Sequence, residues 1–228
     1  MKTNLKKSTF LLTIYNKTFN IAMLTLKKNL PLIPSPQEGE IYHLTEDELN
    51  RLTAEFQKWF EEKRGIVRAR YWLVFLFLRY TGARISEILN IEESRDIDYR
   101  NSTVRLITLK RTGKKKGQYR IIPIPDRLIS EYLRTIKLYP SLEGKVFKIE
   151  RNNFFTVFKA ICKKVGIPSE ISHPHVLRHT RAIELLRSGI PVTAVQQLMG
   201  HASLNTTAMY LRYSNIEIQE LMKSKGLI

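Results

Sequence analysis

The segment that most constrains the fold runs from Tyr71 to Tyr80, reads YWLVFLFLRY, and carries Arg79 as its one charged side chain. Apolar side chains on all faces of a helix are typical of a helix that is buried inside a protein. The next residues, Thr81-Gly82-Ala83, break this helix before a short helix expected over 84–90. Arg84 is therefore expected at a helix entrance beside a dense core.

Helical patterns surround this segment. Thr45 and Glu48 fit a capping box, and apolar residues follow it at helical spacing from Leu49 to Phe60. After Pro125 the pattern is helical almost to the end of the chain. The helices expected there cover residues 126–137, 152–165, 174–188, 192–199, 205–213 and 216–225.

Residues 96–125 change to short β-prone runs. Thr103–Leu109 and Tyr119–Ile124 flank a basic turn, so the sequence predicts an antiparallel hairpin. The expected fold class is therefore mainly α with a small antiparallel β-sheet or hairpin. The turn, counted together with Arg120, carries six basic side chains that could reach along the phosphate backbone of a nucleic acid and are expected to bind it: Lys110, Arg111, Lys114, Lys115, Lys116 and Arg120.

The first 40 residues differ in composition from the rest. They are basic and rich in Thr and Asn, and Pro31, Pro34 and Pro36 follow in an extended linker. We expect an N-terminal arm and linker over 1–40, a compact domain over 41–213, and a C-terminal helix or tail over 214–228.

The charge of the chain indicates its partner. In 228 residues, 38 Lys and Arg stand against 21 Asp and Glu, which gives a net charge of +17. Such an excess favours a polyanion, because binding neutralises phosphates and releases counterions. Nucleic acid is the leading candidate, and an acidic membrane surface is the alternative. No apolar run approaches the roughly 20 residues of a membrane span.

The single cysteine, Cys162, excludes an intrachain disulfide and a cysteine-based zinc cluster and favours a reducing, intracellular setting. His175 and His179 have the spacing of a zinc pair. However, Val176 stands where the zinc-protease motif has Glu, and Arg178 would repel a cation. We expect no metal and no cofactor.

Each remaining candidate has a simpler interpretation when it is taken alone. Arg84 could form a surface ion pair with Glu87, one helical turn later. The lysines of 110–116 could be a solvated hairpin tip, and Tyr210 could be an ordinary aromatic, with Tyr213 as its rival. The interpretation changes only when these residues are considered together.

Together they suit phosphoryl transfer without a metal. His175 and Arg178 lie three apart on one helix face, so they can grip one ligand. Guanidinium groups such as those of Arg84 and Arg178 can hold the nonbridging oxygens of a phosphodiester, where negative charge gathers during attack. A phenol with an ordinary pKa of about 10 can attack phosphorus once its proton is removed. A lysine or histidine near the hairpin can protonate the departing 5′-oxygen.

Several elements of the sequence, taken in order, carry a resemblance to a known family. The first is Thr81-Gly82-Ala83-Arg84-Ile85-Ser86-Glu87, and the second is His175-Val176-Leu177-Arg178-His179. Leu198-Met199-Gly200-His201 follows, and Thr206-Thr207-Ala208-Met209-Tyr210 is the last. Over about residues 41–213 the chain resembles the tyrosine recombinases, or phage integrase family, including its Xer-type members. The resemblance implies the catalytic-domain fold of that family.

The resemblance also implies a role for each matched residue. Tyr210, preferred over Tyr213 by its spacing from Thr206 and Thr207, is expected to attack the scissile phosphate and form a 3′-phosphotyrosyl intermediate. The residues expected to stabilise the transition state are Arg84, Arg178 and His201, and His175 is expected to assist proton transfer. The general-acid lysine of the family lies on a β-hairpin, which favours Lys115 and keeps Lys110 as its rival.

By resemblance, the expected function is a site-specific DNA recombinase or integrase, an enzyme that needs neither metal nor ATP. Its implied partners are double-stranded DNA and further copies of the chain, as a dimer to tetramer on DNA, in the cytoplasm. Most members carry a helical DNA-clamping domain before the catalytic domain, whereas only about 40 residues precede it here. We therefore expect a minimal recombinase whose basic N-terminal arm touches DNA, a partner that supplies the missing surface, or weak binding. The tail over 214–228 resembles C-terminal helices that dock on a neighbouring protomer, with packing on its own domain as the alternative.

Two other functions stay open. A relaxing topoisomerase of type IB kind would use the same phosphotyrosine chemistry without confinement to one sequence. A catalytically idle DNA-binding remnant of the fold would not need a nucleophile. The intact set argues against it, namely Arg84, His175, Arg178, His201 and Tyr210.

Overall fold

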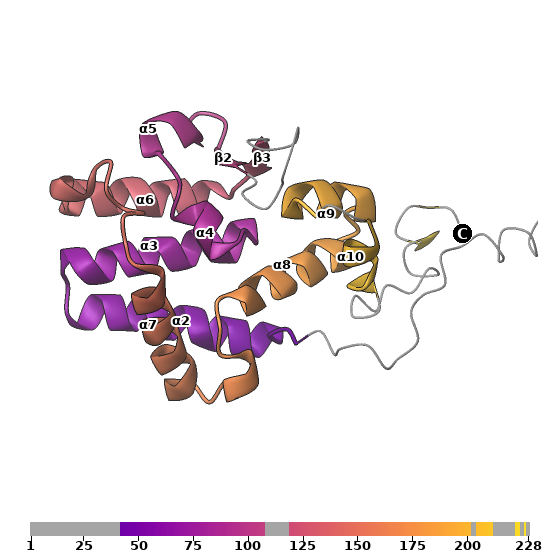
Figure 1. Ribbon diagram of the computed structural model, residues 1–228, viewed down its shortest axis with the longest axis horizontal. Helices are drawn as coiled ribbons and strands as arrows, with labels where there is room; N and C mark the ends of the chain where they lie inside the picture. Colours follow the sequence, from indigo (N-terminus) through magenta and orange to yellow (C-terminus); the bar gives the residue numbers. More distant parts are fainter. Residues whose placement is uncertain (1–41, 108–118, 202–203, 212–221, 224–225, 227–228) are drawn as a thin grey trace, which may run out of the picture. The chain divides into compact units, whose positions relative to one another are not determined.

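The computed structural model describes residues 42–107, 119–201, 204–211, 222–223 and 226, all within the compact unit Ile41–Ile228. This part is mostly helical (Figure 1). It has one three-stranded antiparallel sheet, which confirms the expected fold class. Across the described residues, none of the helices has the length and apolar character that a membrane span requires. The arm predicted over 1–40 and most of the tail predicted over 214–228 lie outside the described residues.

The core is built around α3 (Ile66–Thr81), as the apolar segment predicted. Ten of its 16 residues are buried, and it contacts α2, α4, α6 and α8. Figure 1 shows α2 (Glu46–Glu62) running beside α3. The capping box that starts α2 is present, since the Thr45 hydroxyl accepts the Glu48 N–H at 3.2 Å. Phe56 of α2 stacks on Phe75 of α3 with ring centroids 4.1 Å apart.

The later helices form where the sequence predicted them. α6 (Asp126–Leu138), α7 (Arg151–Lys164), α8 (His175–Arg187) and α9 (Val192–Met199) agree with the predicted ranges to within one residue at each end. Two short 3-10 helices, Pro140–Leu142 and Ser169–Ile171, lie in the connections between them. Regular amphipathic spacing and clear end signals made these helices predictable.

The sheet consists of β1 (Ile97–Asp98), β2 (Thr103–Ile107) and β3 (Tyr119–Pro123) in that order. The register pairs Val104 with Ile122 and Leu106 with Arg120, so these residues share the inner face. The predicted hairpin pairing is confirmed, and residues 108–118 that join its strands lie outside the described part. The short elements β1 and α5 (Glu93–Asp96) were not predicted, because they are too short to carry a periodic pattern.

The end of α8 packs with α9 in a second, smaller apolar cluster, and α10 (Leu204–Ala208) contacts α9. The predicted helix over 205–213 is interrupted, because α10 stops at Ala208 and Met209 and Tyr210 form a turn. Leu211 is helical again, and residues 212–213 lie outside the described part. Tyr210 is itself a member of this apolar cluster, and its backbone N–H donates to the Thr207 carbonyl at 3.0 Å.

Candidate active site

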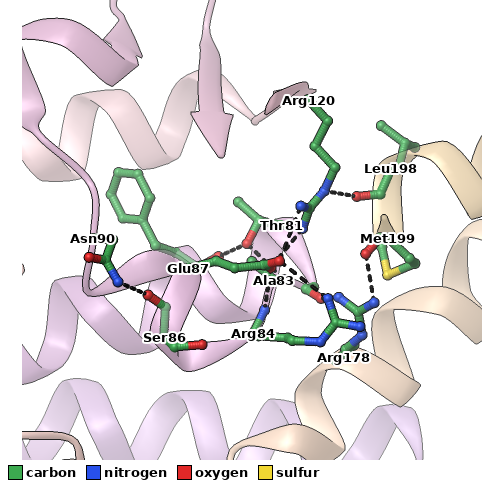
Figure 2. Close-up of polar contacts among 12 residues, drawn as sticks. Thr81, Ala83, Arg84, Ser86, Glu87, Asn90, Arg120, Arg178, Leu198 and Met199 are labelled. Carbon is green, nitrogen blue, oxygen red and sulfur yellow. Dashed lines mark hydrogen bonds and ion pairs between the residues drawn. The ribbon is translucent and has the colours of Figure 1, made fainter. Parts of the chain in front are cut away.

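Arg84 occupies the entrance of α4 (Ile85–Ile88), immediately after α3 ends at Gly82 with a left-handed φ of 62°. Its backbone N–H donates to Glu87 Oε2 at 2.9 Å, and its Nη1 lies 3.2 Å from Glu87 Oε1 (Figure 2). The Arg84 side chain remains 22% exposed, whereas that of Glu87 is 1% exposed. The ion pair considered as the simpler interpretation of Arg84 is thus present, and it orients a guanidinium group that still reaches the surface.

Arg120 on β3 is the second cation on Glu87. Its Nη2 lies 2.8 Å from Glu87 Oε2, and its Nε donates to the Leu198 carbonyl at 2.7 Å (Figure 2). Burial raises the pKa of Glu87, but the hydrogen bonds and charges of Arg120 and Arg84 outweigh it, so that the pKa lies below its ordinary value. Glu87 is therefore an ionised, buried carboxylate shared by two arginines.

The sequence placed Arg120 among the DNA-contacting residues of the hairpin, and the structure puts its side chain inside. It is 10% exposed, because alternate residues of a strand face opposite sides and Arg120 shares the inner face with Ile122. Tyr119 and Ile121 take the outer face and are 61% and 57% exposed. The remaining DNA-contacting candidates, Lys110, Arg111, Lys114, Lys115 and Lys116, lie outside the described residues.

Arg178 lies in α8 and is among the largest fully buried side chains of the described chain, with 1% exposure. Its Nη1 donates to the Gly82 carbonyl at 2.9 Å and its Nη2 to the Met199 carbonyl at 2.6 Å. Burial, and then the neighbouring charge of Arg84, lower its pKa to about 10, so it stays charged at neutral pH. One guanidinium group thus connects the ends of α3 and α9.

His201 follows Gly200, which ends α9 in a left-handed conformation with φ 67°. The His201 ring is 5% exposed, and its Nδ1 lies 2.8 Å from the Thr207 hydroxyl. Burial and the charges of Arg178 and Arg84 lower its pKa to about 3, so it is neutral at pH 7. Its ring stacks on that of Tyr210 with centroids 6.0 Å apart.

The Tyr210 phenol is 3% exposed and forms a hydrogen bond of 2.7 Å with His179 Nδ1. Burial raises the pKa of Tyr210, although the positive charges of Arg178 and Arg84 act in the opposite direction. Burial, followed by the charges of His175 and Arg178, lowers the pKa of His179 to about 3. The neutral imidazole can therefore accept a hydrogen bond from the phenol in the tautomer that leaves Nδ1 unprotonated.

The hydrogen bond to Tyr210 distinguishes His179 from His175, the other histidine of α8, and the sequence did not predict this difference. The sequence assigned proton transfer to His175 and left His179 out of the site. His175 is exposed, and its ring meets that of His179 edge to face at 4.6 Å. Their spacing of four residues placed both rings on one helix face, but no pattern in the sequence indicated which one meets Tyr210.

Four of the predicted site residues therefore lie in one region, namely Arg84, Arg178, His201 and Tyr210. Their mutual electrostatic effects on pKa, together with the Arg178 contacts to Gly82 and Met199, tie them to one locus. In the part of the chain that the structure describes, no group of three or more His, Cys, Asp or Glu side chains could hold a metal ion. The locus is cationic, with a buried phenol beside it.

Comparison with known proteins agrees with this geometry. Residues 43–216 match the phage integrase family. The chain belongs to the phage integrase family. A tyrosine recombinase of Thermosipho africanus (strain TCF52B) is 33% identical over 188 residues, which cover 79% of this chain and 60% of the relative. The tyrosine recombinase XerA of Pyrococcus furiosus (strain ATCC 43587 / DSM 3638 / JCM 8422 / Vc1) is 31% identical, with coverage of 81% and 62%.

Solved structures of the same family share the fold. The XerH site-specific recombinase bound to palindromic difH substrate, in a post-cleavage complex, has a TM-score of 0.63 at 25% identity, and the match covers 87% of this chain and 56% of that chain. A XerA recombinase structure has a TM-score of 0.61 at 24% identity, with coverage of 87% and 68%. The chain spans about three fifths of the length of the curated relatives that it matches.

Proposed function

We propose that this chain carries the catalytic centre of a site-specific DNA recombinase, which cuts and rejoins DNA through a 3′-phosphotyrosyl intermediate. The observation that carries the proposal is the buried phenol of Tyr210 beside a cluster of guanidinium groups. Arg84 and Arg120 pair with the Glu87 carboxylate and Arg178 lies within its electrostatic reach, so these four side chains carry three positive charges and one negative charge, a net charge of +2. Such an excess suits a phosphate that gains negative charge during attack.

The reaction follows from the positions of the side chains. Tyr210 Oη forms a bond to phosphorus while the bond from phosphorus to the 5′-oxygen breaks. Arg84 holds the nonbridging oxygens, and Arg178 stabilises their charge from its buried position on the Gly82 and Met199 carbonyls. His201 lies beside the phenol that attacks. The phosphotyrosine conserves the energy of the broken bond, so a free 5′-hydroxyl can reverse the step without ATP.

Two proton transfers complete this step. The phenol proton passes to His175, the residue assigned from the sequence, which is exposed and in ring contact with His179. His179, whose pKa is lowered to about 3, is too weak a base to keep this proton and holds the phenol by a hydrogen bond before DNA binds. The departing 5′-oxygen receives a proton from the hairpin lysine, Lys115 or its rival Lys110. Because the Tyr210 phenol is 3% exposed, it has to turn away from His179 to reach a DNA phosphate.

Double-stranded DNA is the proposed substrate, and several copies of the chain are proposed to assemble on it, from dimer to tetramer. The net charge of +17 supports a nucleic-acid partner. The related XerH structure is bound to a palindromic substrate, and a palindrome offers two equivalent half-sites to two protein copies. We place the protein with DNA in the cytoplasm, without a metal or cofactor in the reaction.

Covalent capture tests the proposal. The protein is incubated with a library of nicked duplexes of randomised sequence, so that cleavage near the nick releases a short strand and traps the adduct. We expect an adduct that survives denaturant, carries phosphotyrosine and is absent from Tyr210→Phe. An adduct formed by Tyr210→Phe, or none formed by the unchanged protein, would contradict the proposal. Captured sequences that converge on one motif favour a recombinase, and unselective capture favours a relaxing topoisomerase.

A further inference from the structure

Arg120 stands at the base of the basic hairpin, where it is the second residue of β3. Its strand partner Leu106 is 1% exposed, and the Arg120 side chain follows the same inward direction. It therefore leaves the sheet toward the protein interior, away from the surface that a DNA duplex can reach. A role as a direct phosphate contact does not fit this direction.

The Arg120 guanidinium group contacts two further elements. Its Nη2 and Nη1 lie 2.8 Å and 3.3 Å from the two carboxylate oxygens of Glu87 on α4, and its Nε donates to the Leu198 carbonyl near the end of α9. A Cβ atom built on Gly200 would lie 3.0 Å from Arg120 Nη1 and 3.1 Å from its Cζ. The turn that carries His201 therefore lies directly against this guanidinium group, and one side chain joins the hairpin, the Arg84 helix and the His201 turn.

The exposures of the two arginines on Glu87 separate their roles. The Arg84 side chain is 22% exposed and Arg120 only 10%, so Arg84 can meet a ligand while Arg120 remains behind it. Glu87 accepts two hydrogen bonds from the Arg120 guanidinium group, from Nη2 at 2.8 Å and from Nη1 at 3.3 Å, and one from Arg84 Nη1 at 3.2 Å. Arg120 thus takes most of the hydrogen bonds that the carboxylate accepts from side chains. Without Arg120, the buried Glu87 carboxylate would pull the Arg84 guanidinium group toward itself.

We propose that Arg120 is a positioning residue of the active site: through Glu87 it sets the direction of Arg84, and through Leu198 and Gly200 it holds the His201 turn. This inference rests on the proposed recombinase function. Arg120 touches no reacting atom. Its planar fork and separate Nε donor are both used, and a lysine in its place supplies charge but only part of this geometry.

The test compares DNA cleavage with DNA binding in Arg120→Ala and Arg120→Lys. A captured nicked duplex from the library serves as the single-turnover substrate, and the dissociation constant is measured on the same duplex across a salt series. We expect cleavage at saturating DNA to fall about 100-fold in Arg120→Ala, as a misplacement of about 1 Å can produce, and less in Arg120→Lys. The dissociation constant and its salt slope should stay unchanged, because no phosphate contact is lost.

Arg105→Ala is the matched control. It removes an arginine–carboxylate ion pair from the same sheet, between Arg105 of β2 and Asp96, without contact to Glu87 in the pairs described. Thermal unfolding of both variants separates lost stability from lost cleavage. Arg105→Ala should keep its cleavage rate even where its unfolding temperature falls as far as that of Arg120→Ala.

A double-mutant cycle with Glu87→Gln decides whether Arg120 acts through Glu87. We expect the double variant to cleave no more slowly than the worse single variant, since both changes break the same link. Additive losses of cleavage rate in the double variant would overturn the inference. It would also be overturned if Arg120→Ala bound DNA more weakly, with a smaller salt slope, but cleaved at the normal rate at saturating DNA. An absent adduct in the unchanged protein overturns the proposed function and this inference together, whereas a normal adduct with full-rate cleavage by Arg120→Ala overturns only the inference.

Discussion

Arg84 forms a structural ion pair with Glu87 and still presents part of its guanidinium group to a ligand, so the structural and the catalytic interpretation of this residue are compatible. Glu87 fixes the guanidinium group from the protein side, and the exposed part of Arg84 is left for a ligand. Arg178 is held in the same way by backbone carbonyls at Gly82 and Met199. Both arginines are thus oriented before any ligand binds, which reduces the reorganisation that a phosphate would otherwise require.

The hydrogen bond between Tyr210 and His179 can be tested by stability. We expect His179→Leu and Tyr210→Phe each to lower the free energy of unfolding by about 1–3 kcal/mol, because each leaves a buried polar partner unsatisfied. The double variant should lose less than the sum of the two, since both polar groups are then gone. Denaturant unfolding curves measure all four states of this cycle. Strictly additive losses would show that the two side chains do not interact.

Among the elements, α8 contributes most of the site because its functional side chains lie at different depths. Arg178 is buried, His179 is partly buried against Tyr210, and His175 is exposed. Residues three and four apart share one helix face, so a single helix can address both the interior and a surface ligand. The turn after α9 complements it, because the left-handed Gly200 brings His201 back toward this face.

Gly200→Ala tests that turn. Any L-residue pays about 1–2 kcal/mol for the left-handed conformation at φ 67°. The added methyl group would also press on Arg120, which cannot move freely because Glu87 and Leu198 hold it. We expect a lower free energy of unfolding and slower single-turnover cleavage.

Gly144→Ala is the control for this change. Gly144 has a similar φ of 68°, but nothing lies within 4 Å of its added Cβ. It should show the conformational cost alone and cleave at the normal rate. If both variants lose the same free energy of unfolding and Gly200→Ala cleaves at the normal rate, the Arg120 side chain moves aside without affecting cleavage.

On the scale of the whole molecule, the site lies where two apolar clusters meet. Ile85, next to Arg84, belongs to the large core around α3, and Tyr210 belongs to the smaller cluster formed mostly by α8 and α9. Packing therefore buries two histidines of the site, His179 and His201, near positive charges. The stability of the whole fold depends on keeping these rings neutral.

The pH dependence of unfolding follows from the pKa values of these rings. His179 and His201 have pKa values lowered to about 3, against about 6.5 in an unfolded chain. Between these limits the unfolded chain binds more protons, so stability is fully present above about pH 6.5 and is lost as pH falls toward about 3. We expect a lower denaturant midpoint at pH 5.5 than at pH 7. A variant with both histidines changed to Asn should lose less over this interval, and an equal loss would contradict the assignment.

The sequence alone predicted the elements whose signals are local. The capping box at Thr45, the apolar run from Tyr71 to Tyr80 and the glycine ends of the helices depend on neighbours within a few residues, so α2, α3 and the later helices formed as expected. The order of the motifs around Arg84, Arg178 and Tyr210 indicated the family, which the comparison with known proteins confirmed. The roles of the individual residues stay predictions.

Only the tertiary structure decided which side chains meet. That Arg120 turns inward onto Glu87, and that His179 rather than His175 contacts Tyr210, depends on contacts between residues at least 31 positions apart. Residue spacing fixes the face of a helix or strand on which a side chain lies. Whether that face is buried or exposed depends on the elements that pack against it. The sequence therefore determined the parts of the site, and the packing of α8 against α3 and α9 decided how they are arranged.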